Sequence, residues 1–130
     1  MAGIKILIAD DEPSILEIMT RKISSAGFDV VSAHNGKEAW EKIVKEHPDV
    51  IVTDLIMPEM DGFALLNQLR REPPTSKWVP VIIVSSLDEI QNMQKGFDLQ
   101  ADHYLVKPCR FDDIIKAIKM MISIIPLRNS

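Results

Sequence analysis

Several features are scarce in this sequence of 130 residues, and each scarcity excludes a class of protein. The single cysteine, Cys109, excludes an intrachain disulfide framework and a cysteine-rich metal site, and is typical of a reducing cytoplasm. A net charge of -4 gives no general basic footprint for nucleic acid. The longest apolar runs, such as residues 79–84, are too short to span a bilayer, and the N-terminus lacks a signal-type apolar core. We therefore expect a cytoplasmic protein without membrane or direct nucleic-acid contacts.

The residues that are present suit one globular α/β domain, over residues 1–130 with its core at about 4–125. Apolar, mostly β-branched runs predict strands at residues 4–9, 28–32, 50–54, 81–84 and 104–106. Helical spacing of apolar positions predicts five helices that begin near Ser14, Asn35, Asp61, Ser86 and Phe111. Ser86 and Glu89 form a capping-box pattern, and Pro126 is expected to end the last helix.

Strict alternation of strands and helices predicts a parallel sheet with helices on both faces. In such sheets the ligand crevice lies at the carboxyl ends of the strands. Polar residues stand at these strand ends: Asp10, Asp11, Asp54, Ser85 and Lys107. Each alone suits a cap, a turn or a solvated charge. Together they bring three acids, a hydroxyl and an amine to one crevice.

This combination of groups predicts a particular chemistry. Two carboxylates about 4 Å apart repel by on the order of 4 kcal/mol at an effective dielectric near 20, so the cluster needs cations. Lys107 supplies one, and an oxygen-rich site without histidine or thiolate ligands suits Mg²⁺ rather than Zn²⁺. An aspartate carboxylate is a competent nucleophile, so the residues predict phosphoryl transfer onto Asp54.

The motifs at these strand ends resemble the receiver domains of two-component response regulators, the chemotaxis regulators included. They are Asp10-Asp11, Asp54 followed by Met57-Pro58-Glu59-Met60-Asp61-Gly62, Val84-Ser85-Ser86, and Tyr104-Leu105-Val106-Lys107-Pro108. The resemblance covers residues 4–125. It implies a flavodoxin-like (βα)5 three-layer sandwich whose five parallel strands have the family's order, 2-1-3-4-5.

The resemblance also implies a role for each matching residue. Asp54 would accept a phosphoryl group from a histidine kinase or a histidine phosphotransfer protein. Mg²⁺ would bind Asp11, Asp54 and the main-chain carbonyl of Ile56, with Asp10 acting through a coordinated water. Lys107 would pair with one phosphoryl oxygen.

The same resemblance implies a switch. Ser85 would move to another phosphoryl oxygen, Tyr104 would turn inward, and the face built from the fourth helix, fifth strand and fifth helix would signal to a partner or output domain. Such a protein is not an enzyme in the usual sense, because it catalyses only its own phosphorylation and dephosphorylation. The last helix is apolar around much of its circumference, so it docks on a partner, forms a homodimer or continues into more protein.

Two other interpretations stay open. A metal-dependent phosphatase or hydrolase would use the same acids on outside substrates, but aspartate-nucleophile phosphatases place nucleophile and acid two residues apart on the first strand, whereas Asp10 and Asp11 are adjacent. A constitutive interaction module would have a vestigial pocket, yet every acidic, hydroxyl and lysine position is filled.

The residue types predict two further properties, the lifetime of the phosphoryl group and the effect of a substitution at the site. Ile56 and Leu87 would flank the path of a hydrolytic water that neither side chain can orient, so we predict slow loss of the phosphoryl group. The alternative is that both simply pack locally. Because functional acids are held together at a cost, we also predict that Asp10→Ala stabilises the metal-free fold while impairing phosphorylation.

Overall fold

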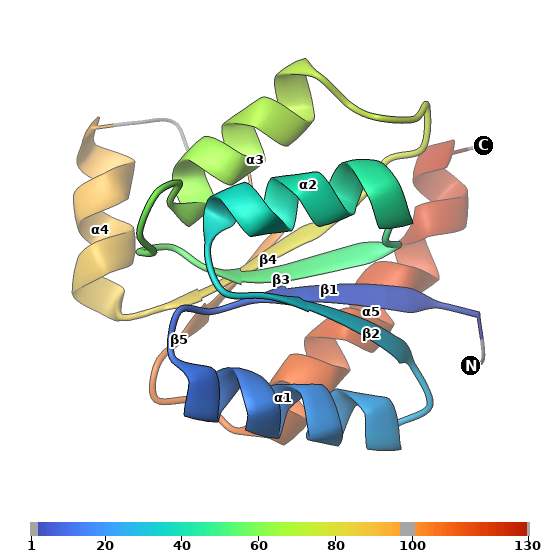
Figure 1. The fold of residues 1–130 in the computed structure, drawn as a ribbon, viewed down its shortest axis with the longest axis horizontal. Helices are drawn as coiled ribbons and strands as arrows, with labels where there is room; N and C mark the ends of the chain where they lie inside the picture. The colour runs from blue at the N-terminus through green and yellow to red at the C-terminus, as the bar shows by residue number, and fades with distance from the viewer. Residues whose placement is uncertain (1–2, 97–100, 130) are drawn as a thin grey trace.

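The computed structural model describes residues 3–96 and 101–129, without the side chains of residues 93–96 and 127–129. Within these residues five strands alternate with five helices (Figure 1). The strands are β1 (Lys5–Ala9), β2 (Asp29–Ala33), β3 (Val50–Asp54), β4 (Val81–Ser85) and β5 (His103–Val106). The helices are α1 (Pro13–Ser25), α2 (Gly36–Glu46), α3 (Gly62–Arg71), α4 (Leu87–Gly96) and α5 (Phe111–Asn129).

The strands form a parallel sheet in the order β2-β1-β3-β4-β5, which confirms the predicted fold. Strand order reverses between β1 and β3, so the carboxyl ends of these two strands meet at the topological switch point. The register aligns Asp54 of β3 with Val84 of β4, and Ser85 with Val106 of β5. All the predicted strand-end residues therefore come to one edge of the sheet.

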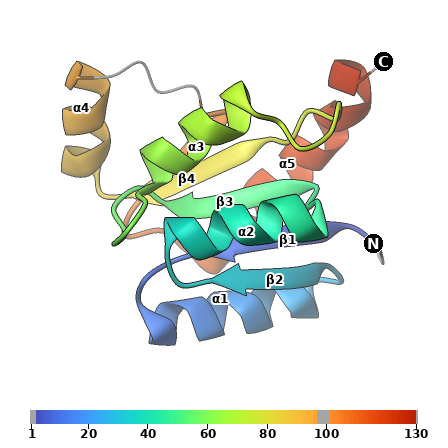
Figure 2. The same cartoon turned by 45° about the horizontal axis from the view of Figure 1, so that its top comes forward.

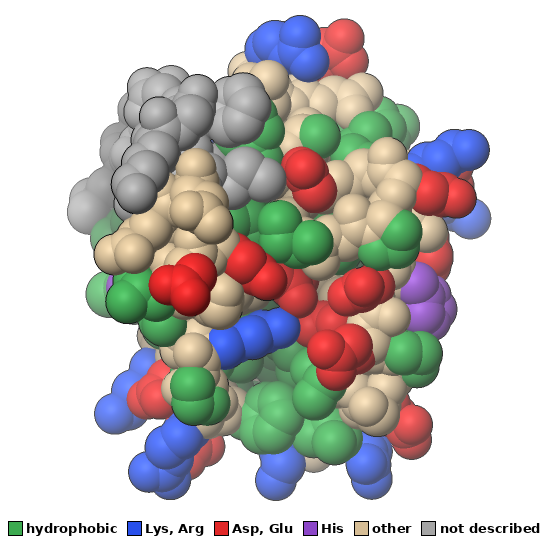
Figure 3. Space-filling view, turned by 90° about the vertical axis from the view of Figure 1, so that its left-hand side faces the viewer, with side chains coloured by type: hydrophobic (Ala, Val, Ile, Leu, Met, Phe, Trp, Pro, Cys, Tyr) green, Lys and Arg blue, Asp and Glu red, His purple; other side chains and the backbone are tan. Residues whose placement is uncertain are grey.

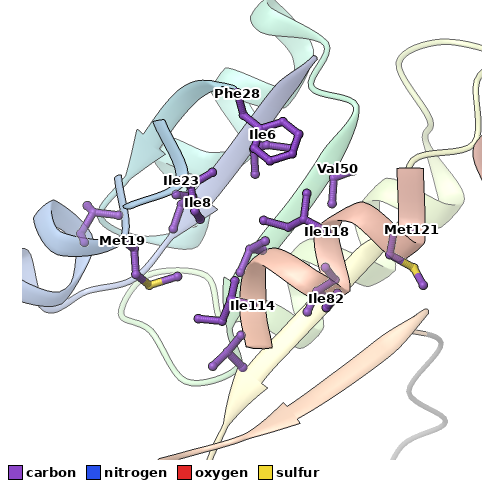
Figure 4. Packing of buried hydrophobic residues seen from close by; sticks show 14 residues of the cluster. Ile6, Ile8, Met19, Ile23, Phe28, Val50, Ile82, Ile114, Ile118 and Met121 are labelled. Carbon is purple, nitrogen blue, oxygen red and sulfur yellow. The ribbon is translucent and has the colours of Figure 1, made fainter. Parts of the chain in front are cut away.

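Apolar side chains cover both faces of the sheet, as the unbroken apolar runs predict. Figures 1 and 2 show α1 and α5 on one face and α2 and α3 on the other, with α4 at the left, past the end of β4. Val50 and Val52 belong to the core cluster under α1 and α5, whereas Ile51 belongs to the opposite cluster. Figure 4 shows the first of these clusters, in which Ile6 and Ile118 are fully buried. Two packed layers thus hold the strand ends in place.

The last helix differs from its prediction at one point. Pro126 does not end it, because α5 continues to Asn129. Proline removes one amide donor and crowds the preceding turn, and the helix nevertheless continues for three residues beyond it.

Much of the apolar surface of α5 is used inside the fold. Ile114, Ile118 and Met121 are buried, and Ile115 and Ile122 pack against the same core. Met120, by contrast, is 45% exposed. In the described part of the chain, α5 and the other helices are all too short or too polar to cross a membrane.

Candidate functional site

Three carboxylates meet where the ends of β1 and β3 lie side by side. Asp10 and Asp11 directly follow β1, and Asp54 is the last residue of β3. Each offers an oxygen atom, and these atoms all lie within 4.8 Å of one another. Asp10 is 3% exposed, while Asp11 is open to solvent. Figure 3 shows this edge of the molecule, where acidic side chains gather around a basic one.

Lys107 supplies the nearby positive charge. Its amide donates to the Ser85 carbonyl at 2.8 Å, which fixes the residue beside the end of β4. Its Nζ lies 2.9 Å from Asp54 Oδ2 and 3.9 Å from Asp10 Oδ2. Burial lowers the pKa of Lys107, but the hydrogen bond and charge of Asp54, with the charges of Asp10 and Glu12, outweigh burial and raise it. The ammonium therefore stays protonated beside Asp54.

Asp10 is the most buried of the three acids. Burial raises the pKa of its carboxyl, and the charges of Asp54 and Asp11 raise it further. A hydrogen bond from the Glu12 amide to Asp10 Oδ1, at 2.9 Å, and the charge of Lys107 act in the opposite direction. One ammonium against three carboxylates leaves this pocket negative.

The donor set shows which kind of ion this pocket could hold. The three grouped ligand atoms are all carboxylate oxygens. Hard oxygen donors suit Mg²⁺ or Ca²⁺, whereas Zn²⁺ favours nitrogen and sulfur. The cluster of Asp10, Asp11 and Asp54 therefore fits a hard divalent cation.

The Asp54 side chain is held from both sides and is 11% exposed. Its Oδ1 accepts the Leu55 amide at 2.7 Å, and its Oδ2 accepts Lys107. Gly62, at the start of α3, donates its amide to the Leu55 carbonyl at 2.7 Å. A Cβ at residue 62 would lie 2.3 Å from the Asp54 carbonyl oxygen, so this close approach requires glycine. The backbone around the carboxylate is thereby pinned to the end of β3.

Ser85 and Tyr104 lie on neighbouring strands. Ser85 is fully buried, and its hydroxyl donates to the Glu89 carboxylate in the first turn of α4. Tyr104 is half-buried in β5 and packs against the core cluster under α2 and α3. From the sequence, the capping-box pattern predicts only a helix cap for Glu89. Ser85 ends a strand and does not belong to the helix, so the spacing of the two residues gives no helical signal that links them.

Ile56 and Leu87 keep exposed apolar side chains next to this site. Ile56 is 45% exposed and Leu87 is 50% exposed. Each comes two residues after a strand-end residue, Asp54 and Ser85 respectively. Both side chains are therefore partly open to solvent beside the strand ends, and their role in hydrolysis stays a prediction.

Comparison with known proteins places the chain in a family. Residues 6–119 match the family described as response regulator receiver domain. The DNA-binding dual master transcriptional regulator RpaA from Synechocystis is 35% identical over 118 residues, which cover 91% of this chain and 48% of that protein. This chain spans about half the length of the curated relatives that it matches.

Solved structures are similar over almost the whole chain. The receiver domain of Francisella response regulator 1452 has a TM-score of 0.79 and 37% identity, covering 92% of this chain and 96% of that one. Response regulator TrrA from Thermotoga maritima, in a complex with Mg²⁺-BeF, has a TM-score of 0.78 and 25% identity, covering 91% and 98%. In sequence and in fold, this chain belongs to the receiver domains of two-component response regulators.

Proposed function

We infer that Asp54 accepts a phosphoryl group in a Mg²⁺-dependent reaction, from a histidine kinase or a histidine phosphotransfer protein. The observation that carries this proposal is the position of Lys107 Nζ, 2.9 Å from Asp54 Oδ2 at the edge of the three-carboxylate cluster. A nucleophilic carboxylate, a cation-binding cluster and a fixed ammonium are the parts that phosphoryl transfer requires.

In the proposed reaction, an Asp54 carboxylate oxygen attacks the phosphorus of the donor's phosphohistidine. A P–O bond forms as the P–N bond breaks, and the electron pair stays on the imidazole nitrogen of the donor. The Lys107 ammonium, already beside Asp54, pairs with a phosphoryl oxygen. Asp10, Asp11, Asp54 and the Ile56 carbonyl would hold Mg²⁺, which when bound supplies positive charge to the phosphoryl oxygens. The Mg²⁺-BeF complex of the Thermotoga relative supports this choice of metal.

The proposal includes a switch and its output. Ser85 moves toward the phosphoryl group, Tyr104 turns inward, and the face formed by α4, β5 and α5 signals to a partner or an output domain. The exposed Met120 of α5 and Val106 of β5 lie on elements of this face, and α5 could also carry a homodimer contact. We further propose that residues 1–130 form a single cytoplasmic receiver domain with its core at about 4–125, and that its catalysis is confined to its own phosphorylation and dephosphorylation.

Intact mass measured after incubation with acetyl phosphate tests the acceptor. We expect one phosphoryl adduct on the wild type with Mg²⁺, none after chelation, and none on Asp54→Ala. Asp29→Asn, at an exposed acid at the other end of the sheet, is the matched control and should form the adduct normally. No wild-type adduct, with Mg²⁺ binding shown independently, would favour the interaction module. Turnover of a generic phosphate ester would favour the phosphatase.

The phosphorylated protein is expected to last for minutes or longer, because the exposed Ile56 and Leu87 side chains offer no group that can orient a water molecule. Intact mass followed over time after donor removal, with Mg²⁺ present, measures the half-life. Leu87→Glu introduces a carboxylate there and should shorten the half-life by about tenfold or more. Val44→Glu makes the same change at a similarly exposed site on α2 and should not. A wild-type half-life of seconds would contradict the prediction.

A further inference from the structure

The Ser85 hydroxyl has a charged partner that the proposed reaction does not use. Ser85 ends β4 and is fully buried, and its hydroxyl donates to Glu89, which lies in the first turn of α4. The Glu89 amide in turn donates to Ser86 Oγ at 3.2 Å, so one half of the expected capping box forms. The carboxylate that would complete the box is instead bonded to the strand-end serine.

We propose that Glu89 is a positioning residue that holds the Ser85 hydroxyl on α4 and competes with the phosphoryl group for it. A serine hydroxyl has one proton to donate, so it cannot donate to Glu89 and to a phosphoryl oxygen together. Hydrogen bonds to ionised acceptors are about twice as strong as neutral ones, so the contact is a considerable restraint. The inference rests on the proposed function, in which Ser85 moves to the phosphoryl group.

The position of the pair gives this competition a mechanical consequence. The Ser85 carbonyl accepts the Lys107 amide, and Asp54 lies on the neighbouring strand in register with Val84. Ser85 therefore lies between the acceptor edge and α4. A phosphoryl group on Asp54 adds negative charge at an edge that is already acidic, which disfavours a further carboxylate nearby. Loss of the Ser85 contact then frees the first turn of α4, so Glu89 links phosphorylation to the position of that helix.

Glu89→Gln tests the restraint, because it keeps the size of the side chain but replaces an ionised acceptor with a neutral one. The matched control is Asp88→Asn, which removes the same charge from an exposed neighbour in the same turn. The measured quantity is the initial rate of adduct formation by intact mass, with Mg²⁺ and acetyl phosphate below saturation. We expect a rise of about fivefold in Glu89→Gln and no change in Asp88→Asn.

A double-mutant comparison separates the restraint from a general effect of charge or stability. In a Ser85→Ala background there is no hydroxyl to hold, so Glu89→Gln should leave the rate unchanged. Equal rates for Glu89→Gln and wild type, or the same gain with and without Ser85, would overturn the inference while leaving the proposed function intact. Failure of every variant, the wild type included, to form the adduct would overturn both.

Discussion

Gly36→Ala is expected to lower the free energy of unfolding by about 3 kcal/mol. A Cβ at residue 36 would lie 1.8 Å from the Met60 carbonyl oxygen and 2.6 Å from its carbonyl carbon. Both atoms belong to the backbone of the segment between β3 and α3, so no side-chain rotation can relieve the clash. Either the start of α2 or the segment that follows Asp54 has to move.

Helix propensity alone predicts the opposite sign, because alanine is favoured over glycine in a helix by about 1 kcal/mol. Urea unfolding of the purified protein distinguishes the two. Lys37→Ala, at the next and exposed residue of α2, is the control and should change stability by less than about 0.5 kcal/mol. If Gly36→Ala were as stable as the wild type, the close approach of α2 to Met60 would be refuted.

The contact at Gly36 also shows where prediction from the sequence ends. Local patterns were sufficient to place the elements: the β-branched run from Val50 to Val52 predicts a strand buried on both faces, and Asn35 caps α2 through the Glu38 amide at 2.8 Å. The approach of residue 36 to residue 60 depends on how a helix and a distant loop pack on the sheet. No local pattern contains that distance.

Some features of the candidate site could likewise be predicted from the sequence, and others could not. Parallel strands bring their carboxyl ends to one edge, so the convergence of Asp10, Asp54 and Lys107 could be predicted once the strands were identified. The hydrogen-bond partner of the Ser85 hydroxyl could not be predicted, because the capping-box pattern of Ser86 and Glu89 suits a bond from Glu89 to the backbone equally well. Only side-chain packing decides that Glu89 bonds to the buried Ser85 hydroxyl.

Asp10→Asn is expected to raise the melting temperature of the metal-free protein by about 4 °C, equivalent to about 1 kcal/mol. The wild-type carboxylate is 3% exposed and lies beside Asp11 and Asp54. Asparagine removes the charge but keeps an oxygen for the Glu12 amide, which Asp10 Oδ1 accepts at 2.9 Å. The alanine variant considered from the sequence would leave that amide without this acceptor, so part of its gain would be lost.

The direction of this stability change follows from the protonation of the wild-type carboxyl. Because burial raises the pKa of Asp10, the fold binds this proton more tightly than the unfolded chain does. The penalty on folding therefore grows as pH rises from the ordinary aspartate pKa through the raised one, and it is fully present above both. Removing the carboxylate removes this penalty, so the variant's advantage should be largest with chelator at neutral pH.

Magnesium should reverse the order of the two proteins. A ligand at about 100 times its Kd stabilises the fold that binds it by about 2.7 kcal/mol, a gain that the wild type receives and the weakened site of Asp10→Asn does not. The melting temperature of Asp10→Asn should therefore be the higher of the two in chelator and the lower of the two in saturating Mg²⁺. Asp11→Asn is the matched control: it removes the same charge from an exposed residue, so it should lose the Mg²⁺ gain with a smaller rise in chelator. A lower melting temperature for Asp10→Asn without metal would show that the buried carboxylate supports the fold, and that the acids are not held together at the expense of stability.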